Sequence, residues 1–113
     1  MIIVHGIKNC DSVKKALKFL KENHIEYTFR DFKEQSVTCD EINEWLKYTS
    51  LEKIFNSKST TYKTFNLKAL NLTDQEKIEW LCRENLLIKR PVLQHNGVTI
   101  VGYNKDQYEM ELL

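Results

Sequence analysis

The chain of 113 residues is long enough for one folded domain with a small insertion. Its 17 basic and 16 acidic residues give a formal net charge of +1, so charge alone gives no reason to expect binding to nucleic acid or to a membrane surface. No apolar run approaches the roughly 20 residues that span a bilayer, and the N-terminus opens directly into a strand-like pattern. We therefore expect a cytoplasmic protein with no direct nucleic-acid binding and no membrane contact.

The first part of the chain, residues 1–35, has the pattern strand, helix, strand. A β-branched run at residues 2–4 predicts a buried strand, and alternating aromatic and polar residues at 25–32 predict a second one. Between them, apolar residues recur at helical spacing while lysines face away. This apolar stripe comprises Val13, Ala16, Leu17 and Leu20. A short crossover of this kind predicts a right-handed βαβ unit with parallel strands.

The middle of the chain, residues 36–85, is predicted to be helical. Thr38 and Glu41 have the spacing of a capping box, which predicts a helix through about Tyr48. Thr73 and Glu76 repeat this spacing and predict a helix through roughly residue 85, and residues 51–55 have the pattern of a short helical turn. The segment is too small to hold a good core alone, so we interpret it as an insertion.

The last part of the chain returns to strands. Two apolar runs at 91–95 and 98–101 flank Asn96-Gly97, a strong hairpin signal because both residues tolerate positive φ. A final helix is expected to begin near Asn104. The order βαβ, helical insertion, ββα fits a mixed four-stranded sheet covered by helices. We therefore expect an α/β protein of thioredoxin-like fold: a single domain over 1–113, with its core in 1–35 and 86–113 and a helical insertion at 36–85.

The three cysteines, Cys10, Cys39 and Cys82, are widely spaced. An odd number cannot all pair internally, which is not typical of a secreted disulfide scaffold. No two of them lie close together in sequence and the histidines are scattered, so the ligand pairs of a structural zinc site are absent and no metal is expected.

Cys10 is the strongest candidate for chemistry because it lies just after the first strand, where the first helix begins. Helix N-termini carry unpaired amides and a partial positive charge, which stabilise a thiolate. Lys8 and Lys14 act in the same direction, and Asp11 opposes them. Because the thiolate is the nucleophile, this position favours a reactive cysteine over a small apolar residue at a helix cap.

The other two cysteines are weaker candidates. Cys39 also lies in the first turn of a helix but has no preceding strand, and Cys82 lies on an apolar stripe typical of a core residue. Val13 occupies the place of the second cysteine of a C-x-x-C pair. Cys10, once oxidised, would therefore need glutathione, another protein or a distant cysteine to release it.

Three segments form a signature: G-I-K-N-C-D-S-V-K-K-A at residues 6–16, K-R-P-V-L at 89–93 and V-G-Y at 101–103. Together they resemble the arsenate reductase (ArsC)-related family, in its YffB- and Spx-like branch, over nearly the whole chain. The resemblance implies a thioredoxin-like fold with Cys10 as the redox cysteine. It also implies Arg90 as the anion-binding neighbour of Cys10, and Pro91 as a cis-proline that faces the cysteine loop.

The chain departs from this family at two anion-binding positions. Arsenate reductases of this type use three arginines; Arg90 matches one, but Lys58 and Tyr103 stand where the others are expected. Lysine supplies charge without the planar fork of arginine, and tyrosine supplies a hydroxyl without charge. These replacements favour a glutathione-dependent thiol reductase over an arsenate reductase.

The resemblance implies a mechanism in which the Cys10 thiolate attacks a disulfide or accepts glutathione, and a second thiol resolves the mixed disulfide. Arg90 and Lys58 would bind carboxylates of the glutathionyl group. The remaining residues expected at the substrate site are Lys8, Asn9, Ser12, Pro91 and Tyr103. No bound cofactor is expected; glutathione is the co-substrate, and glutathione or a protein thiol or disulfide is the partner.

Two other classes of function stay open. The segments at 101–106 and 57–60 also resemble Spx, a redox-responsive regulator that contacts RNA polymerase. Spx usually carries C-x-x-C and continues well past the hairpin and its helix, whereas this chain stops at Leu113. The third class is an interaction module of thioredoxin-like fold without thiol chemistry. Reactivity of the thiol separates the first class from the third, and binding to the polymerase α subunit separates the second.

Overall fold

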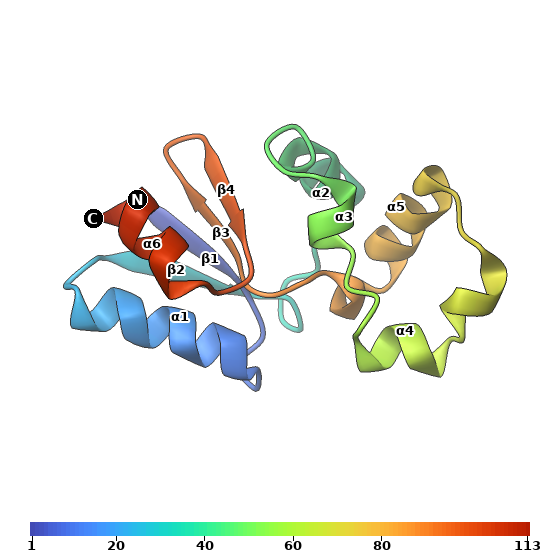
Figure 1. Ribbon diagram of the computed structural model, residues 1–113, viewed down its shortest axis with the longest axis horizontal. Coiled ribbons are helices and arrows are strands. Elements are labelled where there is room, and N and C mark those ends of the chain that lie inside the picture. The colour runs from blue at the N-terminus through green and yellow to red at the C-terminus, as the bar shows by residue number, and fades with distance from the viewer. The chain divides into compact units, whose positions relative to one another are not determined.

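The computed structural model describes all 113 residues, which divide into two compact units (Figure 1). The first, here called the sheet unit, combines residues 1–31 with residues 90–113. The second, the helical unit, is the continuous segment 32–89, within which the insertion expected at 36–85 lies. None of the helices is both long enough and apolar enough to cross a bilayer.

The sheet unit contains one mixed sheet of four strands in the order β2-β1-β3-β4. β1 pairs with β2 in parallel and with β3 antiparallel, and β3 and β4 form an antiparallel hairpin. The strands are β1 (Ile2–Gly6), β2 (Tyr27–Asp31), β3 (Val92–His95) and β4 (Val98–Val101). The predicted mixed four-stranded sheet and its parallel first pair are therefore confirmed.

Two helices complete the sheet unit and share a core with one face of the sheet. α1 (Asp11–Glu22) contributes the predicted apolar stripe, and α6 (Lys105–Leu112) contributes the buried Tyr108. The residues of this core are Ile2, Val4, Ala16, Phe19, Leu20, Leu93, Ile100 and Tyr108. At the hairpin, Asn96 and Gly97 have φ angles of 46° and 77°, which is the left-handed region that the Asn-Gly turn was expected to use.

The helical unit contains four short α-helices and two 3-10 turns. They are α2 (Cys39–Trp45), α3 (Leu51–Ile54), α4 (Thr60–Thr64), η1 (Leu67–Leu70), α5 (Asp74–Arg83) and η2 (Asn85–Leu87). Both predicted capping boxes are present: the backbone N–H of Glu41 donates to Thr38 Oγ1, and that of Glu76 donates to Thr73 Oγ1, each at 3.2 Å. They fix where α2 and α5 begin.

α2 ends three residues earlier than the sequence pattern predicts. After Trp45 the backbone tightens, because Tyr48 N–H donates to the Trp45 carbonyl, an i→i+3 bond of 2.9 Å. Apolar spacing does not distinguish such a turn from a further α-helical turn.

Backbone pairing joins the end of α3 to the C-terminal end of the helical unit. Phe55 forms a bridge with Ile88, and Lys89 N–H donates to the Ile54 carbonyl at 2.8 Å. The buried apolar residues of the unit are Phe32, Val37, Ile42, Trp45, Ile54, Phe55, Leu67, Leu81, Leu87 and Ile88. The segment thus has its own apolar interior.

Candidate redox site

Cys10 is the N-cap of α1, as expected. Its backbone is extended, with φ −146° and ψ 122°, and its carbonyl accepts the first helical hydrogen bond from Lys14 N–H at 3.0 Å. The side chain makes no capping hydrogen bond, is half-buried, and is the one free thiol of the chain. The N-terminus of α1, with its unpaired amides and partial positive charge, therefore lies beside a sulfur that has no disulfide partner and makes no capping hydrogen bond.

Gly6 sets the approach of α1 to the sheet. A Cβ on Gly6 would lie 2.7 Å from Val13 Cγ2, closer than real Cβ contacts come. Val13 is fully buried in the first turns of α1. The absent side chain at Gly6 thus lets the start of α1 pack directly on the end of β1, and this packing fixes the loop that carries Cys10.

The strand register brings the three signature segments to one end of the sheet. His5 in β1 pairs with Val92 in β3, which pairs in turn with Val101 in β4. The residues that follow β1, precede β3 and follow β4 therefore share that end. In Figure 1 the chain leaving β1 for α1 and the chain entering β3 lie together there. Segments far apart in sequence thus meet at the end of the sheet where the Cys10 loop leaves β1.

Arg90 and Pro91 directly precede β3 at this same end of the sheet. The peptide bond between them is cis, as the family resemblance implied. Pro91 is buried and Arg90 half-buried. The Pro91 carbonyl accepts a 2.8 Å hydrogen bond from Gly102 N–H, so the segment before β3 is held to the segment after β4. The segments at this end of the sheet therefore carry a free thiol, a guanidinium and a fixed backbone turn.

The other predicted substrate-binding residues differ in their exposure to solvent. Lys8 and Asn9 are exposed and Ser12 is half-buried, all within two residues of Cys10. Lys58, which belongs to the helical unit, is exposed and its backbone N–H donates to Asn56 Oδ1 at 3.0 Å. Substrate binding by these residues stays a prediction.

Tyr103 has a packing role. Its ring lies edge-on to those of Phe19 and Tyr108, with centroids 6.5 Å and 5.0 Å away. Burial, followed by the neighbouring Tyr103, raises the pKa of Tyr108, whose hydroxyl donates to the Gly102 carbonyl at 2.9 Å. The aromatic cluster therefore helps to fix the V-G-Y segment, and a contact of Tyr103 with substrate stays a prediction.

A buried polar chain crosses three strands of the sheet, and the sequence pattern did not indicate it. Arg30 Nη1 lies 3.0 Å from His5 Nδ1, and His5 Nε2 lies 2.7 Å from Gln94 Oε1. Because a guanidinium only donates, Nδ1 accepts and Nε2 carries the proton that goes to Gln94. The sequence shows only that His5 and Gln94 are polar residues within apolar strand runs and that Arg30 is a polar residue of an alternating strand. This chain ties β1 to both neighbours one residue before Gly6.

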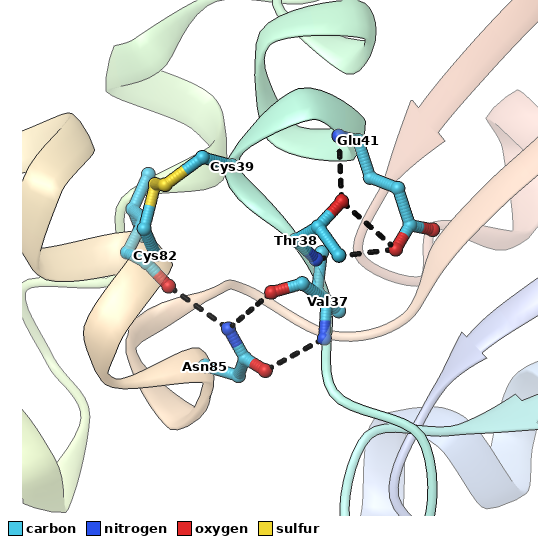
Figure 2. The surroundings of a disulfide bond; sticks show 7 residues. Val37, Thr38, Cys39, Glu41, Cys82 and Asn85 are labelled. Carbon is cyan, nitrogen blue, oxygen red and sulfur yellow. Dashed lines mark hydrogen bonds between the residues drawn. A yellow bond between two sulfur atoms is a disulfide. The ribbon is translucent and has the colours of Figure 1, made fainter.

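Cys39 and Cys82 form a disulfide that joins α2 to α5, with their Cα atoms 5.0 Å apart (Figure 2). The expectation of a core thiol at Cys82 is therefore wrong: Cys82 is half-buried, and its sulfur is bonded to that of an exposed residue. Helical periodicity shows only the face on which a cysteine lies, and the partner is 43 residues away. No group of three or more His, Cys, Asp or Glu side chains is placed to hold a metal ion.

A mixed four-stranded sheet with a cysteine at the first helix N-terminus and a cis-proline before the third strand defines a protein of thioredoxin-like fold. Within that class, the family model of the ArsC family matches residues 5–110. The chain belongs to the ArsC family.

Relatives within this family have more than one description. The global transcriptional regulator Spx of Staphylococcus aureus (strain Mu50) is 31% identical over 109 residues, covering 95% of this chain and 83% of Spx. A solved structure of a YFFB protein is similar over 100% of both chains, with a TM-score of 0.92 and 30% identity. An arsenate reductase (ArsC) related protein from Brucella melitensis has a TM-score of 0.76 and 31% identity, covering 97% of this chain and 92% of that one.

Proposed function

We propose that the protein is a glutathione-dependent thiol–disulfide oxidoreductase with Cys10 as its nucleophile. The observation that carries the proposal is the free, half-buried thiol at the N-cap of α1. Membership of the ArsC family and the cis Arg90–Pro91 bond at the same end of the sheet support it. The other two cysteines are bonded to each other, which leaves Cys10 as the one free thiol of the chain.

In the first step, the Cys10 thiolate attacks a sulfur of the substrate disulfide. A new S–S bond forms at Cys10 while the substrate S–S bond breaks, and the leaving sulfur departs as a thiolate with the electron pair. Cys10 Sγ is available for this attack because Cys10 is the N-cap of α1 and its side chain makes no capping hydrogen bond. When the substrate carries glutathione, the sulfur left on Cys10 is that of the glutathionyl group.

In the second step, a thiolate from free glutathione attacks the glutathionyl sulfur on Cys10. Oxidised glutathione leaves and the Cys10 thiolate is regenerated, so each turnover consumes one free glutathione, and the glutathionyl group of the substrate becomes the other half of oxidised glutathione. Arg90 binds a glutathionyl carboxylate through its planar fork. Lys8, Asn9 and Ser12 position the loop and the bound peptide.

The test is steady-state reduction of a glutathionylated peptide by reduced glutathione. Turnover is expected for the wild type and for the Cys39→Ser/Cys82→Ser double variant, and none above background for Cys10→Ser. Turnover that persists in Cys10→Ser, or that depends on Cys39 and Cys82 instead, would overturn the proposal.

A regulatory role is the second candidate, and the similarity to Spx over 95% of the chain supports it. In this case Cys10 would report oxidation and the protein would contact RNA polymerase. Pull-down with the polymerase α subunit tests this role, with retention expected if it holds. Retention together with no turnover in the glutathione assay would favour the regulator over the enzyme.

A further inference from the structure

We propose that Cys39 and Cys82 form a second redox couple, which opens and closes by exchange with glutathione independently of Cys10. Both cysteines lie in the helical unit, whereas Cys10 lies in the sheet unit. Cys39 is the first residue of α2, and Cys82 lies in the last turn of α5. The disulfide therefore joins the ends of two helices within the helical unit.

Asn85 holds the two cysteine-bearing segments together without the sulfur atoms (Figure 2). Its Oδ1 accepts from Val37 N–H at 2.8 Å, and its Nδ2 donates to the Val37 carbonyl at 3.2 Å. Nδ2 also donates to the Leu81 carbonyl at 3.0 Å, within the last turn of α5. Val37 lies two residues before Cys39, and Asn85 lies three residues after Cys82. One side chain thus clamps the start of α2 to the end of α5.

The backbone around each cysteine is fixed by further contacts. The Thr38–Glu41 capping box sets the start of α2. Ile42 is buried on α2 and Leu81 on α5, and these two helices pack on each other. Because none of these contacts needs the S–S bond, reduced Cys39 and Cys82 stay adjacent. Two groups held in place react as an intramolecular pair, which favours rapid re-formation of the disulfide.

Cys39 is the sulfur that an external thiolate is expected to attack, because Cys39 is exposed and Cys82 is half-buried. A glutathione thiolate attacks Cys39 Sγ, the bond to Cys82 breaks, and Cys82 leaves as a thiolate that water protonates. A second glutathione thiolate then attacks the glutathionyl sulfur on Cys39. Oxidised glutathione and the Cys39 thiolate are released, so one protein disulfide is reduced by two glutathione molecules. Oxidised glutathione drives the reverse sequence.

The equilibrium is measured on full-length Cys10→Ser protein in glutathione buffers of stepped ratio, by acid quenching, alkylation and intact mass. We expect two thiols to appear together in reducing buffer while the far-UV circular dichroism stays folded, and the disulfide to return in oxidising buffer. A disulfide that opens only when the chain unfolds, or thiols that never re-pair, would overturn the proposal. Because Cys10 is absent, the result is independent of the proposed function.

Two variants test the clamp. Asn85→Ala should lower the equilibrium constant for disulfide formation about fivefold or more, because three hydrogen bonds are lost. Asn43→Ala makes the same chemical change at an exposed position of α2 and should leave the constant unchanged. If Asn85→Ala does not fold, Asn85→Asp retains the acceptor for Val37 N–H, loses both donated bonds, and should shift the constant in the same direction. Equal constants for the Asn85 variants and Asn43→Ala would overturn the role of the clamp.

The site of attack is tested with single-thiol proteins that lack Cys10. Oxidised glutathione should modify Cys39 in the Cys82→Ser protein several-fold faster than it modifies Cys82 in the Cys39→Ser protein. Faster modification of Cys82 would contradict the proposed order of steps.

Discussion

At the scale of single residues, Gly6 affects the reactive loop through packing, because the contact between Gly6 and Val13 positions the loop that carries Cys10. Its missing side chain leaves room for Val13, and Val13 lies three residues after Cys10 in the first turns of α1. A glycine in a strand often marks such a close approach, but the atom that would clash is known only once α1 is placed. The geometry of the Cys10 loop therefore depends on a residue that carries no chemistry.

Gly6→Ala is expected to lower the free energy of unfolding by about 1–3 kcal/mol, because Val13 is buried and cannot move away without repacking. The same displacement should slow the reaction of Cys10 with a thiol reagent. Urea unfolding and alkylation kinetics measure the two effects.

The matched control is Gly97→Ala. Gly97 has a φ of +77°, and a Cβ added there would have no atom within 4 Å beyond its two chain neighbours, so the change costs about 1 kcal/mol of backbone strain alone. Gly97→Ala should leave the rate of Cys10 alkylation unaltered. If Gly6→Ala also leaves that rate unaltered, the packing of Gly6 on Val13 does not position the loop.

We expect the charge of Arg90 to favour disulfides that carry a carboxylate over uncharged disulfides. Arg90→Gln should slow the reaction of Cys10 with oxidised glutathione on the order of tenfold, because a charge-assisted bond to a carboxylate is lost. An uncharged disulfide such as hydroxyethyl disulfide should react with Cys10 at a nearly unchanged rate.

Lys8→Gln is the control, since it removes a cation from an exposed position of the Cys10 loop. Its effect with oxidised glutathione should be smaller. Equal losses with both disulfides in Arg90→Gln would mean that Arg90 acts on the thiol or the fold and does not bind the carboxylate.

At the scale of elements, local rules predicted what local contacts decide. The stripe of α1, the two capping boxes and the Asn-Gly hairpin depend on neighbours within a few residues, and all are present. α4 was not predicted because none of its residues is buried, so it has no apolar stripe. The clearest sequence signal for α4 is Ser59, a residue type favoured at helix N-caps. In the structure the Ser59 hydroxyl accepts from Tyr62 N–H at 3.1 Å.

The capping box of α5 predicts a pH dependence. The Thr73 backbone N–H, and after it the Thr73 side chain, hydrogen-bonds the Glu76 carboxylate and lowers the pKa of Glu76 below its usual value. A group whose pKa is lower in the folded state contributes stability above its unfolded pKa and loses it as pH falls through the folded value. This contribution is therefore lost in acid.

Urea unfolding at about pH 6 and about pH 3 measures this loss. Glu76→Gln should flatten the pH dependence of the midpoint relative to the wild type. Glu79→Gln removes the same charge from α5 outside the capping box and should follow the wild type. A Glu76→Gln slope equal to that of Glu79→Gln would rule out the capping contribution.

At the scale of the whole molecule, long-range pairings decide what the sequence could not show. The order of elements was sufficient to predict a mixed four-stranded sheet and the placement of Cys10 after β1. The buried chain from Arg30 through His5 to Gln94 needs three strands in register, and His5 and Gln94 are 89 positions apart in the sequence. The Cys39–Cys82 bond likewise depends on how α2 packs on α5.

The disulfide closes a loop with a sequence separation of 43 residues inside the helical unit. A loop of this length is worth about 4 kcal/mol in the chain-entropy model. The Cys39→Ser/Cys82→Ser variant should therefore have a Tm lower by about 10 °C or more than the oxidised wild type.

Differential scanning calorimetry measures the change, and Cys10→Ser is the control because it removes a thiol that bridges nothing. Its Tm should stay near that of the wild type. A double variant with the Tm of Cys10→Ser would show that the bond contributes no stability.

The role of Cys10 as the nucleophile is tested by intact mass after incubation with oxidised glutathione, followed by reduced glutathione. We expect one glutathionyl adduct on the wild type and on Cys39→Ser/Cys82→Ser, mapped to Cys10 and released by reduced glutathione. Cys10→Ser should carry no such adduct at the short incubation times that saturate the wild type. No adduct on the wild type, or an equally fast one on Cys10→Ser, would contradict the claim.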